Sequence, residues 1–552
     1  MGIIVAFLLI TPIAYSSYII PLTDEEPTVR VLIRQPVPSP EVDLPDVLGA
    51  SVDWTENANG LYEDVFGLLN PAPVGELINL EPSHLRFPAT HLSQVYDWTL
   101  GVGNRNDRGE NPVHGGATAP TRFGTDEFFK LVDHTGAEAV MVVNANTGTA
   151  NKSANWVSYC NDDQFTRQGR TRAANGYYTP YGIKDWEIGY EPYIPRYWSG
   201  VSTSETPAGT QYGLRVRDFA ERMKAIDPTI KVGAWMVLDP ELELHSADPS
   251  WNMNFLNAAE GMFEVGERDY FYFDYVVVSV HLPGIDTLLD FPDLFRYSYA
   301  TTMRNLMDDL DQLQRLLATT SRGGGPIPLG IASFQPEFGD SGWNTQAPGY
   351  AASAVITADM AIQLLDATLE NGKQRIRYAC YGELNTPTYE ALMINPDFEA
   401  SHLDTWGRSP NYLAFQLATK LQGGEPLLVS QLEPVTFDVE TGRDLSGVKN
   451  VPLVSAFATG DPDKGIVHIL LLNRDLERTV DCRLDVEMTG LSSLASLSVR
   501  PIDHESLLGT NLARETVRSP PPDDDRDVNP SGFKVRLGPA SVVLLTLETG
   551  GS

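Results

Sequence analysis

Two glutamates, each beside a proline, are the residues of this sequence best placed to do chemistry. Glu191 follows the short apolar stretch 185–189 and is followed at once by Pro192, and Glu337 follows Pro336. Because a proline restricts the residue before it to extended conformations, we expect Glu191 to lie where a strand stops and a loop begins. Two carboxylates that flank one bond can serve as a proton donor with a raised pKa and as a nucleophile or base, which is the pair that glycoside hydrolysis requires. The sequence therefore predicts a glycosidase in which Glu191 is the proton donor.

The elements that must position these residues alternate between strand-like and helix-like segments. Most strand-like segments are unbroken apolar runs, which are typical of parallel strands buried on both faces. Eight strand–helix pairs predict an α/β fold, a (β/α)8 TIM barrel with long loops, and a doubly wound open sheet is the alternative. The predicted strands are 48–53, 84–87, 138–144, 185–189, 230–236, 274–281, 327–335 and 376–381, and the predicted helices are 62–69, 125–132, 154–160, 214–226, 253–263, 297–318, 350–369 and 412–421.

In barrels of this kind the active site lies at the carboxyl ends of the strands. Glu191 ends the fourth predicted strand and Glu337 the seventh, and these strands lie across a closed barrel from each other, so the two glutamates can converge on one substrate. A separation of ~5 Å between them would give a retaining, double-displacement mechanism. The polar residues expected at this end of the barrel are Asp53, Arg86, Asn144, Glu191, His281, Glu337 and Glu383.

Several of these residues also have a purely structural interpretation. Glu187 points the same way along its strand as Glu191 and could be the proton donor instead, and Glu337 could be a surface loop residue. Arg86 is expected to hold an internal ion pair near the pocket floor more than to touch substrate, and His281 could be a buried core residue or could face the pocket. The tryptophans that could stack on sugar rings, or belong to the core, are Trp98, Trp186, Trp198 and Trp343.

A second, all-β domain is expected after the barrel. Gly423-Gly424 marks the boundary, and the strict alternation of apolar residues over 480–488 predicts a β-sandwich beyond it. Residues 28–34 alternate in the same way and are expected to pair as a strand into the sandwich, whereas the Pro- and Asp-rich insert 519–525 predicts an exposed loop. The predicted units are 1–17 as a candidate signal peptide, 18–45 as an N-terminal segment with that strand, 46–424 as the catalytic barrel and 425–552 as the sandwich.

Composition limits the partners. The formal net charge of −33 argues against nucleic acid and anionic membrane surfaces and favours a neutral ligand. Three widely spaced cysteines form neither a disulfide framework nor a metal site, and no His and carboxylate ligands cluster in the sequence, so no metal or other cofactor is expected. The apolar run 3–15 predicts a signal peptide and a secreted or cell-surface protein, with a retained N-terminal anchor as the alternative. A homo-oligomer is compatible with the sequence.

Further segments match, in order, those of a known family. They are Leu85-Arg86-Phe87-Pro88, Tyr96-Asp97-Trp98, Gly101-Val102-Gly103, 123–128, Val143-Asn144, Thr147-Gly148-Thr149, 154–161 and Trp186-Glu187-Ile188-Gly189. With these segments, the chain from about residue 48 to the end resembles glycoside hydrolase family 51, the retaining α-L-arabinofuranosidases. The resemblance implies that Glu191 is the general acid/base, that Glu337 is the nucleophile, and that Asp53 takes the place of a glutamate that binds sugar hydroxyls. It also implies a barrel whose C-terminal β-sandwich recruits an N-terminal strand.

Two departures from that family concern the sugar pocket. Where the family has Gly-Gly-Asn, this chain has Ala89-Thr90-His91, and where the family has an asparagine before the acid/base it has Tyr190. Because Tyr190 cannot replace the paired donor and acceptor of an amide, the accepted sugar is expected to differ. A retaining barrel glycosidase of endo-glycanase or β-glucuronidase type and a non-catalytic carbohydrate-binding surface protein are the alternatives. The predicted substrate-binding residues are Asp53, Arg86, His91, Trp98, Asn144, Tyr190, His281 and Gln335, of which His281 and Gln335 would orient the nucleophile.

Overall fold

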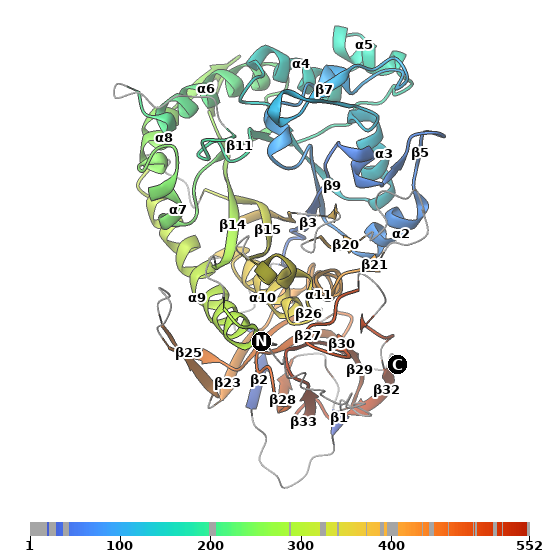
Figure 1. Cartoon of the computed structure of the whole chain (residues 1–552), viewed down its shortest axis with the longest axis vertical. Coiled ribbons are helices and arrows are strands. Elements are labelled where there is room, and N and C mark those ends of the chain that lie inside the picture. The colour runs from blue at the N-terminus through green and yellow to red at the C-terminus, as the bar shows by residue number, and fades with distance from the viewer. Residues whose placement is uncertain are drawn as a thin grey trace, which may run out of the picture.

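The structure, a computed structural model, describes most of the chain (Figure 1). The candidate signal peptide 1–17, Trp198 and Glu383 lie outside the described residues. Those residues are 19–20, 29–36, 43–197, 206–285, 289–320, 327–338, 342–370, 373–382, 384–386, 391–394, 407–432, 434–440, 447–461, 463–488, 491, 494–511, 516–521 and 523–548. Within them, no helix is both long enough and apolar enough to span a membrane.

Eight parallel strands close into a barrel, which confirms the predicted TIM-barrel fold and all eight predicted strands. The unbroken apolar runs have a simple cause, because one face of each strand fills the barrel interior and the other packs against helices. In chain order the strands are β3 (Leu48–Ser51), β6 (His84–Phe87), β9 (Glu138–Val143), β10 (Asp185–Ile188), β11 (Lys231–Trp235), β14 (Tyr275–Ile285), β15 (Leu329–Phe338) and β18 (Ile376–Tyr381). β18 pairs with β3 to complete the barrel.

Helices surround the barrel, and most of them lie where the apolar periodicity predicts them (Figure 1). The long α9 buries one stripe of leucines, Leu306, Leu310, Leu313 and Leu317, against the rest of the protein. The helices at predicted positions are α3 (Thr125–Thr135), α4 (Ala150–Asn161), α6 (Ala208–Ile226), α8 (Trp251–Ala259), α9 (Phe291–Leu317), α10 (Ser353–Asp366) and α11 (Pro410–Thr419).

The helix predicted over 62–69 is wrong. That stretch forms a short hairpin of β4 (Tyr62–Glu63) and β5 (Leu68–Leu69). The one-turn element α1 (Glu56–Asn59), whose residues all have positive φ, precedes the hairpin, and the first regular helix after β3 is α2 (Pro71–Asn79). The local start signals explain the difference, because the Asn70 side chain accepts a hydrogen bond from the Ala72 N–H and Pro71 occupies the first turn. These caps favour a helix beginning at residue 71.

Beyond the barrel, two antiparallel-rich sheets enclose a second apolar core, as the alternation predicted. One sheet has the order β1-β33-β28-β2-β23 and the other the order β22-β26-β27-β34-β29-β32. The insert predicted as a loop is wrong in part, because β32 (Asp523–Val528) pairs with β29 (Ala495–Pro501) at an edge of its sheet, where charged residues are tolerated. The other strands are β1 (Ile19–Ile20), β22 (Glu425–Pro426), β23 (Leu428–Leu432), β26 (Val454–Asp461), β27 (Ile466–Asn473), β28 (Val480–Glu487), β33 (Phe533–Leu537) and β34 (Ser541–Glu548).

The N-terminal strand β2 (Val29–Arg34) lies inside the first of these sheets, as predicted. It runs parallel to β28 and antiparallel to β23, and buries Val29, Val31 and Ile33 while Arg30 and Arg34 face solvent. The two ends of the chain therefore share one apolar core. A buried ion pair of 2.8 Å between Arg474, just after β27, and Asp359 of α10 joins this domain to the barrel.

Candidate active site

A polar cavity of about 350 Å³ opens at the carboxyl ends of the barrel strands. Five predicted substrate-binding residues line it, namely Asp53, Arg86, His91, Tyr190 and Gln335. The remaining lining residues are Ser51, Thr55, Asn59, Thr90, Tyr197, Ala332, Ser333, Gly382 and Leu384. Each predicted catalytic glutamate lies close in sequence to a lining residue. Glu191 comes directly after Tyr190, and Glu337 comes two residues after Gln335.

One imidazole joins the two glutamates. Nε2 of His281 lies 3.0 Å from Oε1 of Glu191, and Nδ1 of the same ring lies 2.7 Å from Oε2 of Glu337. The structure therefore brings together the carboxylates of the fourth and seventh strands, as the barrel topology predicted. His281 contacts both carboxylates and 27% of its side chain is exposed, so it is not a core histidine.

Strand register places His281 beside Glu337. In the parallel pair of β14 and β15, His281 lies opposite Gln335, and Pro283 lies opposite Glu337. Gln335 and Glu337 are two residues apart and point to the same side of β15. The pairing shifts by one residue after Val278, and such an irregularity re-aims the side chains that follow it.

Glu191 lies in a strained loop rather than in the extended backbone expected before a proline. β10 ends at Ile188, and Glu191 has a φ of 37°, in the left-handed region that residues with a side chain rarely occupy. The carboxylate is buried, whereas 44% of the Glu337 side chain is exposed. Tyr193 donates a second hydrogen bond to Oε1 of Glu191, at 3.4 Å. The turn thus directs Glu191 inward to His281.

The contacts of His281 with Glu191 and Glu337 shift the pKa values of His281 and Glu191 in opposite directions. Burial alone would lower the pKa of His281, but the hydrogen bonds and charges of Glu191 and Glu337 raise it well above its ordinary value. Burial alone would raise the pKa of Glu191, but the hydrogen bond and charge of His281 outweigh it and lower that pKa. His281 therefore favours its protonated form, in which both ring nitrogens donate to the neighbouring carboxyl groups.

Arg86 and Glu187 form a buried ion pair beneath the cavity, as expected for Arg86. Nε and Nη2 of Arg86 donate to the two oxygens of Glu187 at 2.7 and 2.6 Å, and the Tyr378 hydroxyl donates to Glu187 at 2.7 Å. Glu187 is fully buried, and all of these partners donate to it. This geometry favours Glu191 over Glu187 as the proton donor.

Asp53 lies in the cavity wall with an unusual pKa. Thr90 donates to Oδ2 of Asp53 at 3.0 Å, and the Trp54 N–H donates to Oδ1 at 2.6 Å. Burial raises the pKa of Asp53 to about 6, and these hydrogen bonds only partly oppose it. Asp53 therefore changes charge near the pH at which many hydrolases work.

The residues that depart from the family form an aromatic wall of the cavity. His91 stacks on Tyr197 with ring centroids 5.1 Å apart, and Tyr190 meets Tyr197 edge-on at 6.0 Å. The guanidinium of Arg86 lies 5.5 Å from the centre of the Tyr190 ring. Tyr197 was not predicted, since nothing in the spacing of a loop aromatic indicates which way it faces.

Three predicted substrate-binding residues, His281, Trp98 and Asn144, are not among the residues that line this cavity. His281 contacts the two glutamates instead, whereas Trp98 and Asn144 belong to the scaffold. Trp98 is buried in the core, where its indole stacks on Trp156 and donates to the Lys152 carbonyl at 2.9 Å. The Asn144 amide donates to Thr147 Oγ1 at 2.9 Å and accepts from three backbone N–H groups of residues 146–148. Both side chains are already engaged in the scaffold, so the structure gives them structural roles.

The chain is similar in sequence and in fold to proteins named as arabinofuranosidases. The family profile of the Alpha-L-arabinofuranosidase 1 domain matches residues 76–264, which include Glu191. A probable alpha-L-arabinofuranosidase C of Aspergillus clavatus is 33% identical over 175 residues, and that match spans about a third of the relative's length, 32% of each chain. An intracellular exo-alpha-(1->5)-L-arabinofuranosidase 1 of Bacillus subtilis is 22% identical over 505 residues, 89% of this chain and 90% of its own.

Solved structures show the same fold. The alpha-L-arabinofuranosidase of Thermotoga maritima, crystallised with arabinose, matches with a TM-score of 0.74 and 20% identity, over 94% of this chain and 100% of its own. A family 51 alpha-L-arabinofuranosidase of Bifidobacterium longum matches with a TM-score of 0.75 and 18% identity, over 96% of this chain and 100% of its own. The resemblance to family 51 is thus confirmed.

In the part of the chain that the structure describes, no group of three or more His, Cys, Asp or Glu residues could hold a metal ion.

Proposed function

We propose that this arabinofuranosidase-like chain is a retaining glycoside hydrolase that acts on an oligosaccharide or polysaccharide by double displacement. The observation that carries the proposal is the contact of His281 with both Glu191 and Glu337, which lie close in the chain to Tyr190 and Gln335 in the lining of a polar cavity. A hydrolase of this type needs one carboxylate that attacks and one acid that protonates the leaving oxygen. The likeness to named arabinofuranosidases supports an arabinofuranoside-like substrate.

In the first step the carboxylate of Glu337 attacks the anomeric carbon, and the bond to the leaving oxygen breaks. Forming the ester neutralises Glu337, and His281 thereby loses one of the two anions that raise its pKa. The proton on Nε2 of His281 then moves to Glu191, 3.0 Å away, and from Glu191 to the leaving oxygen. The products are a glycosyl ester on Glu337, a neutral His281 and a free alcohol.

In the second step Glu191 acts as a base. Its carboxylate takes a proton from water, the resulting hydroxide attacks the anomeric carbon, and the ester bond to Glu337 breaks. Glu337 leaves as a carboxylate, which raises the pKa of His281 again, so the proton on Glu191 returns to the imidazole. The cycle ends in the charge state of the resting site.

The sugar that this pocket accepts is proposed to differ from that of an enzyme with asparagines at positions 91 and 190. Aromatic rings of His91, Tyr190 and Tyr197 cover one wall, and Asp53 supplies a carboxylate acceptor opposite the Arg86 floor. Rings favour the apolar face of a sugar, whereas amides bond particular hydroxyls. A retaining glycosidase of different specificity is therefore the second candidate function.

The proposal is tested by removing each glutamate and following the anomer released. Glu337→Gln should lower kcat by more than about 10⁴-fold, as losses of nucleophiles do, and Glu191→Gln by about 10²–10⁴-fold on substrates with poor leaving groups. Azide should restore turnover to a Glu191→Ala variant with an activated aryl glycoside. Product of inverted configuration, or full activity in either variant, would sink the assignment.

Secretion and assembly belong to the proposal as well. Export to the medium or the cell surface rests on the apolar run 3–15, and the mass of the mature N-terminus tests it. A homo-oligomeric state is tested by light scattering on the purified protein.

A further inference from the structure

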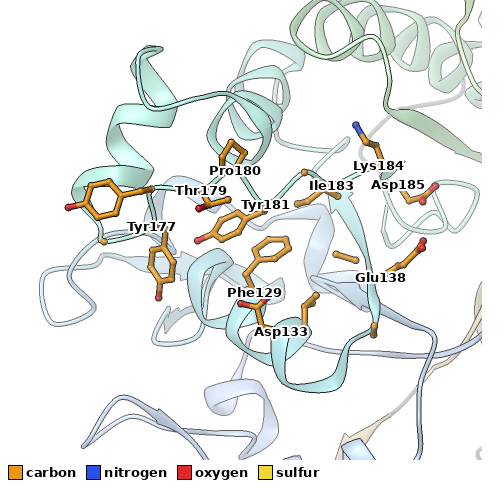
Figure 2. Close-up of a pocket in the computed structure, with 16 residues that line it drawn as sticks. Phe129, Asp133, Glu138, Tyr177, Thr179, Pro180, Tyr181, Ile183, Lys184 and Asp185 are labelled. Carbon is orange, nitrogen blue, oxygen red and sulfur yellow. The ribbon is translucent and has the colours of Figure 1, made fainter.

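A second cavity, of about 660 Å³, lies at the opposite end of the barrel from the candidate active site (Figure 2). Its lining includes Glu138 and Asp185, the first residues of β9 and β10, whereas Glu191 comes after the last residue of β10. Because a strand advances about 3.3 Å per residue, the four residues of β10 alone place roughly 10 Å between Asp185 and the turn that leads to Glu191. A ligand here is therefore not the sugar that Glu191 and Glu337 act on.

One wall of this cavity is aromatic and comes from the segment between α5 (Arg167–Ala174) and β10. The ring of Tyr181 stacks on Phe129 of α3, with centroids 3.9 Å apart and planes 11° apart, and Tyr177 lies 5.9 Å from Tyr181 (Figure 2). Tyr178 belongs to the same wall and is 68% exposed, so its ring is open to a ligand. Ligand sites are typically concave and lined by apolar and aromatic side chains with a few polar groups.

The aromatic wall is held rigidly from behind. The buried guanidinium of Arg172 donates to the carbonyls of Tyr177 and Tyr178, at 3.1 and 3.5 Å, and to the carbonyl of Asp162 at 2.7 Å. The Tyr181 hydroxyl donates to the buried carboxylate of Asp126 at 2.9 Å. A ligand would thus meet rings that are already in place, so binding would cost little ordering entropy.

Polar groups complete the cavity and limit what can bind. The carboxylates of Asp133 and Glu138 and the hydroxyl of Thr179 lie around the tyrosines (Figure 2). Burial, with the charge of Asp126 after it, raises the pKa of Tyr177, so that its hydroxyl stays a donor at any physiological pH. A purely apolar ligand would leave these polar groups without water. An anion would meet three lining carboxylates, those of Asp133, Glu138 and Asp185, against the one ammonium of Lys184, on a protein of net charge −33. A neutral polyol with an apolar face matches both kinds of surface.

We propose that this cavity is a second carbohydrate-binding site, which holds a neutral oligosaccharide segment of a polymer at the end of the barrel away from the catalytic glutamates. The choice of polymer rests on the proposed function, but binding here requires neither Glu191 nor Glu337. The site retains the protein on polysaccharide and takes no part in bond cleavage.

Binding is tested in native gels that contain arabinan or arabinoxylan, and by titration with linear arabino-oligosaccharides, using the Glu337→Gln protein so that the polymer stays intact. Tyr178→Ala removes an exposed ring and should weaken the affinity by about two- to tenfold, where tenfold corresponds to ~1.4 kcal/mol. Phe165→Ala is the matched control, because Phe165 is 77% exposed on the neighbouring loop but does not line the cavity. It should leave the affinity unchanged.

A second readout separates this site from the active site. In the otherwise unchanged protein, Tyr178→Ala should leave kcat/KM on a small aryl glycoside unaltered while raising the concentration of polysaccharide needed for half-maximal rate. If neither polysaccharide retards the protein, or if Tyr178→Ala and Phe165→Ala weaken binding equally, the proposal is overturned. Loss of turnover in Glu337→Gln would uphold the proposed function, and retention of that protein in the gel that Tyr178→Ala weakens and Phe165→Ala does not would uphold the second site separately.

Discussion

Nε2 of His281 lies 3.0 Å from Oε1 of Glu191, and this contact decides which of the two groups holds the proton before substrate binds. A general acid usually has a raised pKa, yet the hydrogen bond and charge of His281 lower the pKa of Glu191. The proton is held instead on His281, which is hydrogen-bonded to Glu191. In the proposed mechanism the acid is therefore a pair of residues, and its titration belongs to the pair.

His281→Gln should change the pH profile of kcat/KM. In the unaltered protein the proton is present below the raised pKa of His281, so activity should fall only as the pH rises through that value. With glutamine the acid is Glu191 alone, and the basic limb should move to lower pH by about one unit or more. His134→Gln, at an exposed position of α3, is the control. An unmoved basic limb in His281→Gln would exclude the shared proton.

The same pair should also make folding stability depend on pH. A raised pKa in the folded state means that the stabilising proton is bound fully below the unfolded pKa, about 6.5, and is lost as pH rises through the folded value. The difference in unfolding free energy between the unaltered protein and His281→Gln should therefore be largest below pH ~6.5 and shrink at higher pH. Urea unfolding at a series of pH values measures it, and a difference that grows with pH would contradict the charge assignment.

Asp53→Asn should remove a limb of the pH profile near 6. The raised pKa means that Asp53 is protonated below about 6 and becomes an acceptor for sugar hydroxyls above it, so kcat/KM should rise through that pH in the unaltered protein. The asparagine variant should be flat there. Thr90→Val removes a hydrogen bond that lowers the pKa of Asp53, so its limb should move to higher pH. If Thr90→Val moved the limb to lower pH, Asp53 would not be its source.

Tyr190→Asn should redirect sugar preference. The change replaces a ring of the aromatic wall by an amide that bonds hydroxyls, and sites of the two kinds discriminate differently. The ratio of kcat/KM for an aryl α-L-arabinofuranoside to that for other aryl glycosides should rise by about tenfold or more. His91→Asn, alone and combined with it, shows whether the two positions act together. A constant ratio would mean that neither residue sets specificity.

Arg86→Met should destabilise the fold strongly. It leaves the carboxylate of Glu187 buried without its cation, a loss that typically costs about 3–5 kcal/mol. Arg222→Met breaks an exposed pair with Asp218 and should cost less than about 1 kcal/mol. Chemical denaturation compares the two variants. Equal losses would show that the ion pair under the cavity is not a buried one in solution.

Much of the fold was predictable because most barrel strands are apolar runs and seven of the eight predicted strands have a polar residue at or near the carboxyl end. Closure of the barrel then brings Glu191 and Glu337 together, since strands four and seven face each other. The contact of His281 with both was not predictable, because it depends on a register shift of one residue between β14 and β15. The φ of 37° at Glu191 likewise depends on its surroundings, which override the local effect of Pro192.

Residue type was a weaker guide to what faces the cavity. Trp98 and Asn144 have the chemistry of sugar-binding residues, but their partners, Lys152 and the loop 146–148, are set by tertiary packing. Tyr197 lies in a loop with no periodicity, so nothing local indicates that it stacks on His91. Spacing identifies the end of a strand, whereas the direction of a side chain beyond that end is decided by its neighbours.

The central place of β2 in the sandwich has a consequence for how the protein is made. Its partners β23 and β28 belong to the last part of the chain, so at about 5–20 residues per second β2 waits on the order of 20–90 s for them during synthesis. The barrel can close in that interval, but the sandwich cannot. Until translation ends, Val29, Val31 and Ile33 are an uncovered apolar edge, and the nascent chain is most exposed to aggregation or chaperone capture at its beginning.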